Sequence, residues 1–130
     1  MKYLCLICAE RSEMMEFRSP AAAKQHFAEY QAFTDDIRRS GQLAGANRLQ
    51  PPDTAVTVRV RNGKVSTTDG PYAETKEQLG GYYLIEAADL NEAIRIAARI
   101  PGAQVGCVEV RPVAQDVETV RLLGEAAAKV

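Results

Sequence analysis

The segment GYYLIEAADLNEAIRIAARIPG, residues 81–102, decides the fold of this chain. Residues 81–87 are apolar at successive positions, which predicts an interior strand covered on both faces. Asp89 then supplies a helix N-cap and Glu92 stands three residues later, the spacing of a capping box. The helix stops at Pro101-Gly102, and residues 106–113 give a last strand. The apolar stripe expected on this helix consists of Leu90, Ala93, Ile94, Ala97 and Ile100.

The N-terminal part of the chain repeats this order of elements. Residues 2–8 are apolar on both faces and predict a second interior strand. Ser19-Pro20 is an N-cap followed by proline at the first helical position, and Ser40-Gly41 is a typical helix stop. Residues 42–49 return as a strand. The helix between Ser19-Pro20 and Ser40-Gly41 has an expected apolar stripe with spacings of four and three. This stripe consists of Ala23, Phe27, Tyr30, Phe33 and Ile37.

A hairpin is expected between the two halves. Val56, Val58 and Val60 alternate with polar residues, which predicts a half-buried strand. Asn62-Gly63 fits a type I′ turn because both central residues need positive φ, and residues 64–68 form the returning arm. The order β-α-β, hairpin, β-α-β predicts an α+β, ferredoxin-like split βαβ fold with an inserted β-hairpin.

The length of 130 residues corresponds to one domain, which we expect over residues 1–113 with a C-terminal helical tail over residues 114–130. A split βαβ sheet carries helices on one face only. The strands that begin at Lys2 and Gly81 are apolar on both faces, so their second face needs a cover. The same face of another subunit gives a homodimer, and the chain's own hairpin and tail give a monomer.

Composition excludes several classes of partner. With 46% hydrophobic residues, 25% charged residues and a net charge of −1, the chain has no long-range field to attract nucleic acid or an anionic membrane. No apolar stretch approaches the roughly 20 residues that span a bilayer, and the apolar N-terminal run is too short for a signal peptide. A cytoplasmic protein is the default expectation. No Walker-type loop, dinucleotide fingerprint or nucleophile elbow is present, and we expect no cofactor.

The cysteines predict structural roles. Cys5 and Cys8 form a C-x-x-C motif, but a separation of three residues on a strand sends the two side chains to opposite faces. They cannot then share a metal or a disulfide, and burial as small apolar side chains is expected. Cys107, in the last strand, has the same interpretation.

The run DGPYAETKEQLGG, residues 69–81, is the first candidate for ligand contact. It is a turn, and it gathers ionisable and hydrogen-bonding groups in a loop held by two strands. A solvated charge pattern with no ligand is the alternative. Metal binding is disfavoured because no His or Cys accompanies the carboxylates. The candidate ligand contacts are Asp69, Tyr72, Glu74 and Lys76.

The first predicted helix carries the other candidates. His26, the only histidine, stands one helical turn before Tyr30. A histidine with a pKa of about 6.5 is a natural general base, and a phenol one turn away can position a substrate. The alternative places His26 at the partly exposed edge of the stripe and Tyr30 in the core. Arg48 either faces the cleft, where it would bind a carboxylate or phenolate, or is an ordinary surface residue.

Several of these segments together resemble one protein family. The helix motif Tyr30-x-x-Phe33-Thr34, the run from Asp69, the strand at residues 80–85 and the closing residues 108–112 are similar to the DGPF branch of the YCII-related family. The resemblance covers most of residues 1–113. It implies a dimeric α/β-barrel fold with a cleft between the sheet and the first helix of each subunit. Wider relatives include a dehydrochlorinase for chlorinated hydroxyquinols, small monooxygenases and isomerases.

The resemblance does not carry over a catalytic pair. In the YCII-like branch the proposed pair is a His early in the first helix and an Asp in an Asp-Pro step after the second. The corresponding positions here fall on Tyr30 and on Ile100-Pro101. Any chemistry in this chain must therefore use other groups.

Two functions remain open at this point. One is a cofactor-independent lyase or isomerase that moves protons on a small metabolite. Its base would be His26 or Glu74, and Tyr30, Tyr72 and Arg48 would position the substrate. The other is a non-catalytic ligand-binding or regulatory protein, which the resemblance associates with stress responses under extracytoplasmic-function sigma factors. The sequence does not decide between an enzyme and a binding protein.

Overall fold

The computed structural model describes residues 1–114 and residue 121. The helical tail expected over residues 114–130 therefore lies outside the described residues, apart from Ala114 and Arg121. The described strands are β1 (Lys2–Ala9), β2 (Leu43–Arg48), β3 (Val56–Arg61), β4 (Lys64–Asp69), β5 (Gln78–Glu86) and β6 (Cys107–Pro112). The described α-helices are α1 (Pro20–Arg39), α2 (Leu90–Ala98) and the short α3 (Gly102–Val105).

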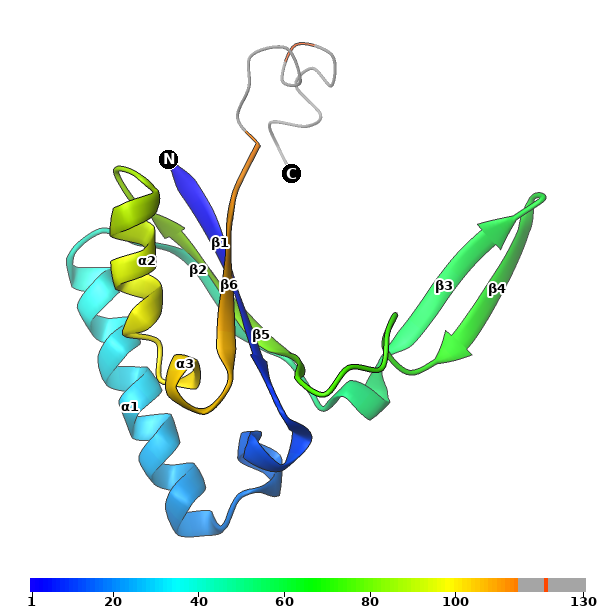
Figure 1. Cartoon of the computed structure of the whole chain (residues 1–130), viewed down its shortest axis with the longest axis horizontal. Coiled ribbons are helices and arrows are strands. Elements are labelled where there is room, and N and C mark those ends of the chain that lie inside the picture. Colours follow the sequence, from blue (N-terminus) through cyan, green and yellow to red (C-terminus); the bar gives the residue numbers. More distant parts are fainter. Residues whose placement is uncertain (115–120, 122–130) are drawn as a thin grey trace.

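Four of the strands form one sheet in the order β2-β5-β1-β6, and each neighbouring pair is antiparallel. Both long helices lie on the same side of this sheet (Figure 1). This is the order and layering of a ferredoxin-like split βαβ unit, so the predicted fold class is confirmed. Short 3₁₀ turns at Arg11–Glu13, Met15–Phe17 and Pro52–Thr54, together with α3, are additions that the sequence patterns did not predict.

Both predicted helix starts are confirmed by their caps. The Ser19 hydroxyl accepts a hydrogen bond from the Ala22 N–H at 3.3 Å. The Asp89 carboxylate accepts from the Glu92 N–H at 2.9 Å, and the Glu92 carboxylate accepts from the Ala88 N–H at 3.1 Å. The capping box therefore closes one residue before the N-cap, and each long helix begins where its capping residue directs.

The buried face of α2 differs from the predicted stripe. Leu90 and Ile94 are 46% and 49% exposed, whereas Ile96 is only 3% exposed. The residues that pack on the sheet have the spacing i, i+3, i+4, i+7, and Leu90 and Ile94 lie beside this face. The prediction was wrong at these two positions because a nine-residue helix with apolar side chains on several sides does not specify its buried face. The buried face consists of Ala93, Ile96, Ala97 and Ile100.

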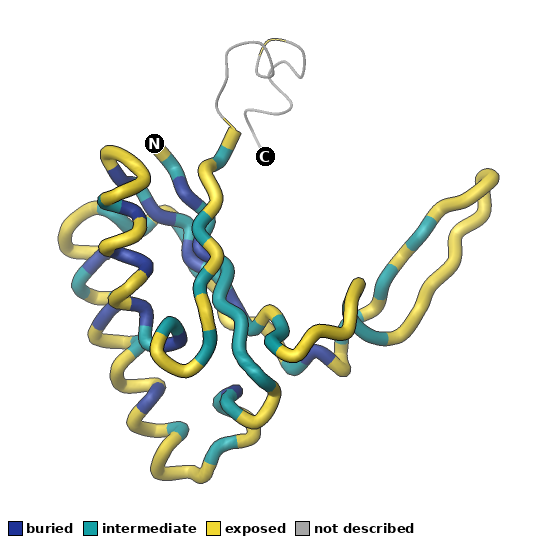
Figure 2. The backbone as a smooth tube through the Cα atoms, viewed as in Figure 1, coloured by how far each residue is buried: buried dark blue, intermediate teal, exposed yellow. Residues whose placement is uncertain are grey.

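The stripe of α1 also begins differently from the prediction. Phe27 is 54% exposed, and its neighbour His26 is buried at 9% exposure. The sheet-facing residues therefore follow the spacing four, three and four from His26 through Tyr30 and Phe33 to Ile37. Figure 2 shows that buried positions on α1 lie on the side that faces the sheet.

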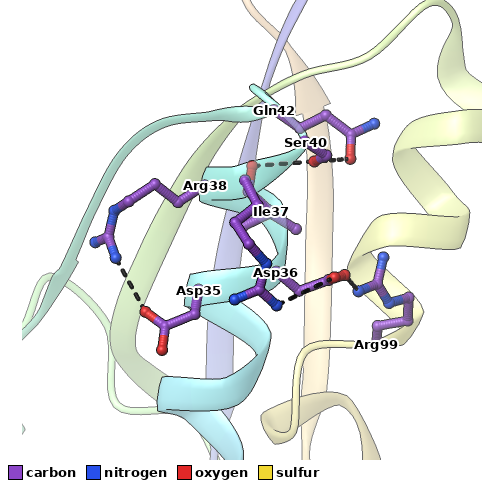
Figure 3. Close-up of polar contacts among 8 residues, drawn as sticks. Asp35, Asp36, Ile37, Arg38, Ser40, Gln42 and Arg99 are labelled. Atoms are coloured by element: carbon purple, nitrogen blue, oxygen red, sulfur yellow. Dashed lines mark hydrogen bonds and ion pairs between the residues drawn. The ribbon is translucent and has the colours of Figure 1, made fainter.

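Polar contacts lie at the ends of the two helices, on the solvent side of this core. Arg99, just after α2, pairs with the Asp36 carboxylate on α1 (Figure 3). The Arg38 guanidinium donates to the Asp35 carboxylate at 3.1 Å, and the Ser40 hydroxyl donates to the Ile37 carbonyl at the same distance. Because these groups are largely exposed, their contribution to stability is modest, and the apolar contacts beneath them position the helices.

The hairpin of β3 and β4 forms its own two-stranded sheet and projects from the body (Figure 1). Asn62 and Gly63 have φ values of 51° and 74°, which confirms the type I′ turn. Val56, Val58 and Val60 are 56 to 60% exposed, so the predicted half-buried strand is wrong. The alternation predicts the strand correctly, but it carries no information on whether a second layer covers it.

The cysteines divide between the two sides of the sheet. Cys5 is 0% exposed within the core, as expected. Ile7 packs against the same core, and the next residue, Cys8, lies on the opposite face because strand side chains alternate. The two residues of the C-x-x-C motif thus face opposite ways, as predicted. Cys107 is exposed, so its predicted burial is wrong: β6 is an edge strand and this side of it carries no helix.

The revised face of α2 gives a matched stability test. Replacement of Ile96 by Ala should lower the free energy of unfolding by about 2–5 kcal/mol, because it opens a cavity in the core. Ile94→Ala removes the same atoms from the same helix at a half-exposed site and should cost less than about 1 kcal/mol. Urea unfolding of both variants measures the difference. Equal losses would mean that the helix presents a different face to the sheet.

Candidate functional site

A cavity of about 480 Å³ lies between α1, along residues 26–38, and the adjacent part of the sheet. We call it the α1 cavity. Its wall comes from α1, from β1, β2 and β5, from α3 and from the turns between residues 13 and 16. In Figure 1, α1 continues past the end of α2. Its lining side chains include Ile7, Met14, His26, Tyr30, Thr34, Arg48 and Tyr83.

His26 is a buried titratable group in this wall. Its side chain is only 10% exposed, so the alternative of a partly exposed edge position is wrong. Its ring meets the Tyr30 ring edge to face at 4.9 Å. Burial lowers the pKa of His26 below 6.5, the Arg18 charge lowers it further, and the carboxylates of Glu29 and Glu13 oppose this. His26 is therefore neutral at pH 7 and can accept a proton.

Tyr30 is held by the backbone at the start of α3. Its phenol oxygen accepts a hydrogen bond from the Gly102 N–H at 3.0 Å. Burial raises the pKa of Tyr30 to about 12, although the Gly102 hydrogen bond opposes the shift. The phenol thus stays protonated at neutral pH, and its own hydrogen remains available to donate. Gly102 directly follows Ile100-Pro101, the position that corresponds to the Asp-Pro step of the resembled family.

Gly102 is required at this contact. A Cβ atom at position 102 would lie 2.5 Å from the Tyr30 phenol oxygen and 2.7 Å from Cγ2 of Ile7. Both distances are too short for any side chain. The sequence pattern identified Gly102 only as part of a helix stop, and nothing in the chain around it indicated that its N–H would bind a tyrosine 72 residues away.

Tyr83 extends the aromatic wall from β5. Its ring is stacked parallel to that of Tyr30, with centroids 6.4 Å apart and 4° between the planes. The Thr34 hydroxyl donates to the Tyr30 carbonyl at 2.8 Å, so it must accept its second hydrogen bond, at 2.6 Å, from the Tyr83 phenol. Burial raises the pKa of Tyr83 as well. Two protonated phenols with fixed orientation therefore form one side of the α1 cavity.

Charged groups lie at the mouth of the cavity. Arg48 lines it, as the sequence proposed, but its guanidinium is bound to the Glu16 carboxylate at 2.6 Å and its side chain is 60% exposed. Arg18 pairs with the Glu13 carboxylate at 3.0 Å and donates from Nε to the Glu13 carbonyl at 2.7 Å. A substrate anion at Arg48 would have to displace or share the bond with Glu16.

The turn region that supplies Glu13 and Glu16 was not found by sequence analysis. Met14, in the same stretch, is 8% exposed and lies in the cavity wall. These residues belong to two three-residue 3₁₀ turns, which have no periodicity long enough to detect. The only signal was a run of Met and Glu between a strand and a helix N-cap.

The candidates from the run at residues 69–81 lie elsewhere. Asp69 and Glu74 line a second, more open depression of about 270 Å³ next to Arg11. Tyr72 is 84% exposed, and the Lys76 ammonium lies 3.2 Å from a Glu10 carboxylate oxygen. The structure therefore brings His26, Tyr30 and Arg48 together in one cavity and places the other four candidates outside it.

Two surveys of the described residues bear on the class of site. No group of three or more His, Cys, Asp and Glu side chains among them is arranged to hold a metal ion. No helix in this part of the chain is long and apolar enough to cross a membrane.

Comparison with known proteins adds a family. The profile described as "YCII-related domain" matches residues 1–116. An uncharacterised protein of Rhizobium meliloti (strain 1021) is 46% identical over 77 residues, which is 58% of this chain and 62% of that protein. The match thus spans less than two thirds of the length of this relative.

The electrostatics of the cavity predict a histidine that titrates below its ordinary pKa. NMR titration of the C–H resonances of His26, the only histidine, should give a pKa below 6.5. Arg18→Gln should raise this pKa, because the substitution removes a positive charge that opposes protonation. Arg111→Gln, on an edge strand away from the cavity, serves as the control and should leave it unchanged. A pKa in wild type at or above 6.5 would contradict the burial of His26.

The same pKa predicts a pH dependence of stability. Because the pKa of His26 is lower in the folded state, the unfolded state binds more protons as the pH falls below 6.5. Stability should therefore be lost from pH 6.5 down to the folded pKa, and His26 should have no effect above pH 6.5. Urea unfolding across this range should show a smaller loss in His26→Gln than in wild type. Identical slopes for the two proteins would contradict the assignment.

Proposed function

The chain belongs to the YCII-related family, and from that premise we propose that its α1 cavity binds a small metabolite from which His26 removes a proton. We place the chain in the DGPF branch of the family on the motif at residues 69–81. The observation that carries the proposal is a buried, neutral His26 in edge-to-face contact with the protonated Tyr30 in one cavity. The activity is that of a cofactor-independent lyase or isomerase.

The roles of the two residues follow from their protonation states. His26 has a free lone pair at neutral pH and is the proton acceptor. Tyr30 accepts a hydrogen bond from the Gly102 N–H, which polarises the phenol and makes its O–H a better donor. A donor at this position stabilises negative charge that develops on a substrate oxygen. The pair suits removal of a proton from carbon next to a carbonyl group.

The reaction begins with the breaking of a C–H bond of the substrate. The C–H proton moves to His26, and the electron pair of the broken bond moves onto the carbonyl oxygen, which Tyr30 hydrogen-bonds. In an isomerase, His26 returns the proton to a different carbon. In a lyase, the electron pair expels a leaving group from the neighbouring carbon. The aromatic wall of Tyr30 and Tyr83 and the cavity volume of about 480 Å³ favour a small aryl or phenolic carbonyl compound.

The reaction predicts hydrogen exchange at an acidic carbon. In D₂O the protein should catalyse deuterium incorporation next to the carbonyl of benzylic ketones such as 2-tetralone, followed by NMR. His26→Ala should abolish the protein-dependent rate. Tyr30→Phe should reduce it by roughly 10²-fold, because it removes one donor to the developing oxyanion.

Glu74→Ala is the matched control, because Glu74 is a candidate base that lies in the other depression. This variant should exchange at the wild-type rate. Loss of activity in Glu74→Ala with full activity in His26→Ala would move the base from the α1 cavity to the run at residues 69–81.

A non-catalytic ligand-binding or regulatory role is the second candidate. It is favoured by the ion pair between Arg48 and Glu16, since these groups satisfy each other without a substrate. A binding protein would gain thermal stability from a ligand without catalysing exchange. A regulatory role beside extracytoplasmic-function sigma factors belongs to this second candidate and rests on the family resemblance.

We also propose that the chain forms a homodimer through the face of the sheet that carries no helix. An apolar patch on this face supports the dimer. Leu4 of β1 and Leu84 of β5 lie directly opposite each other on the side away from the core, and both are partly exposed. Leu6 continues this patch along β1. A second copy of the same face would remove these side chains from water.

The dimer predicts a sensitivity to charge on this patch. Light scattering after gel filtration should give twice the chain mass for wild type and the chain mass for Leu84→Glu, because the carboxylate would be buried unpaired. Val65→Glu, at a 70% exposed position of the hairpin, is the control and should leave the dimer intact. A wild-type monomer at micromolar concentration would contradict the proposal.

A further inference from the structure

Two cysteines that are 99 positions apart in the sequence lie directly opposite each other in the sheet. Cys8 of β1 is the register partner of Cys107 of β6. The Val113 N–H donates to the Lys2 carbonyl at 3.0 Å in the same pair of strands. Because hydrogen-bonded and non-hydrogen-bonded pairs alternate in an antiparallel ladder, Cys8 and Cys107 form a hydrogen-bonded pair with Cα atoms about 5.5 Å apart. That spacing is within the range of about 4.4–6.8 Å for a disulfide.

Gly106 fixes this alignment. A Cβ atom at position 106 would lie 2.1 Å from the Cys8 carbonyl oxygen and 2.9 Å from Cα of Ala9. Only glycine therefore allows β6 to begin so close to β1. The cysteine that follows Gly106 is held beside Cys8 by the backbone, independently of any attraction between the two thiols.

The pair lies at the edge of the sheet, where β6 is the last strand, and is open to solvent in the single chain. Cys107 is exposed and Cys8 is partly exposed, in contrast to Cys5 in the core. The Glu77 carboxylate and the Cys8 thiol both influence the pKa of the Cys107 thiol. Neither cysteine lines the α1 cavity, since Cys8 faces away from the helices.

We propose that Cys8 and Cys107 are a redox modification site, a cross-strand dithiol that a low-molecular-weight disulfide such as oxidised glutathione converts to an intramolecular disulfide. The Cys107 thiolate attacks one sulfur of oxidised glutathione, which forms a mixed disulfide and releases one glutathione thiolate. The Cys8 thiolate then attacks the Cys107 sulfur and releases the second. Two electrons pass to the glutathione, and the two protons of the cysteines end on its two thiolates.

The carboxylates around the pair set the rate. Partial desolvation raises the pKa of both thiols, and the charges of Glu77 and Glu109 raise it further, since a thiolate beside a carboxylate is disfavoured. Only the thiolate attacks a disulfide. Oxidation is therefore slow at neutral pH and becomes faster as the pH rises, and it becomes faster when the Glu77 charge is removed.

The bond would act on a junction that also serves the α1 cavity. Ile7, the residue before Cys8, faces Gly102 across the start of α3. Gly102 in turn holds the Tyr30 phenol, and only residues 103–106 separate it from Cys107. A disulfide between Cys8 and Cys107 would therefore hold both ends of this short segment at a fixed distance from β1.

The test is oxidation of the full chain with a mixture of oxidised and reduced glutathione at mildly alkaline pH. Intact mass should fall by two hydrogen atoms, and the number of titratable thiols should fall from three to one. Peptide mapping under non-reducing conditions should join the peptides that contain Cys8 and Cys107. Glu77→Gln should form the bond several-fold faster at neutral pH, and Cys5→Ala should form it at the wild-type rate.

Three results would overturn the proposal. One is a stable glutathione adduct on Cys107 that never closes. Another is a disulfide between two chains, seen as a dimer band on a non-reducing gel. The third is a native protein that keeps all three thiols although its unfolded form reacts. Cys8→Ala and Cys107→Ala should each give no internal disulfide, which links the mass change to this pair.

Discussion

The structure depends on the hydrogen bonding of β1 along both of its edges. This first strand of the chain pairs with β5 on one side and β6 on the other, so both strands that flank it belong to the C-terminal half of the domain. Because its side chains alternate between faces, Cys5 and Ile7 build the core under the helices, whereas Leu6 and Cys8 belong to the open face. The α1 cavity and the cysteine pair thus lie on opposite sides of adjacent residues of one strand.

The α1 cavity follows from the unequal lengths of the two helices. At 1.5 Å per residue, the 20 residues of α1 span about 30 Å, whereas the nine residues of α2 span about 14 Å. Both helices pack on the same face of the sheet, and α1 extends beyond the end of α2. Beyond the end of α2 its inner side faces β2, β5, the turns after β1 and the start of α3, which fill the space incompletely. His26 and Tyr30 stand on this part of α1, and this explains why a histidine occupies a buried position there.

The sequence predicted the architecture well because the required signals are local. Caps at Ser19 and Asp89, the turn at Asn62-Gly63 and the apolar strands each depend on a few neighbouring residues, and each was confirmed. The buried faces of the helices were predicted less well. Phe27 is more apolar than His26, yet the position of α1 over the sheet, which is set by distant residues, buries the histidine.

The site could be predicted only in part for the same reason. The spacing of His26 and Tyr30 was visible in the sequence, but the bond from Gly102 to Tyr30 and the pairing of Cys8 with Cys107 depend on strand register and on close backbone approach. Neither has a local signature. The motif at residues 69–81 does not mark the cavity, since its charged side chains lie outside it.

The protonation states of the cavity restrict the chemistry that it can perform. Burial holds Tyr30 and Tyr83 in the protonated form and His26 in the neutral form. His26 is therefore the proton acceptor, and Tyr30 is the phenol with a hydrogen available to donate, since Tyr83 donates to Thr34. The carboxylates Glu13 and Glu16 are committed to ion pairs with Arg18 and Arg48. An arrangement with a single base suits a reaction in which the same group takes a proton and returns it. It suits hydrolysis less well, because hydrolysis requires a base for water and a separate acid for the leaving group.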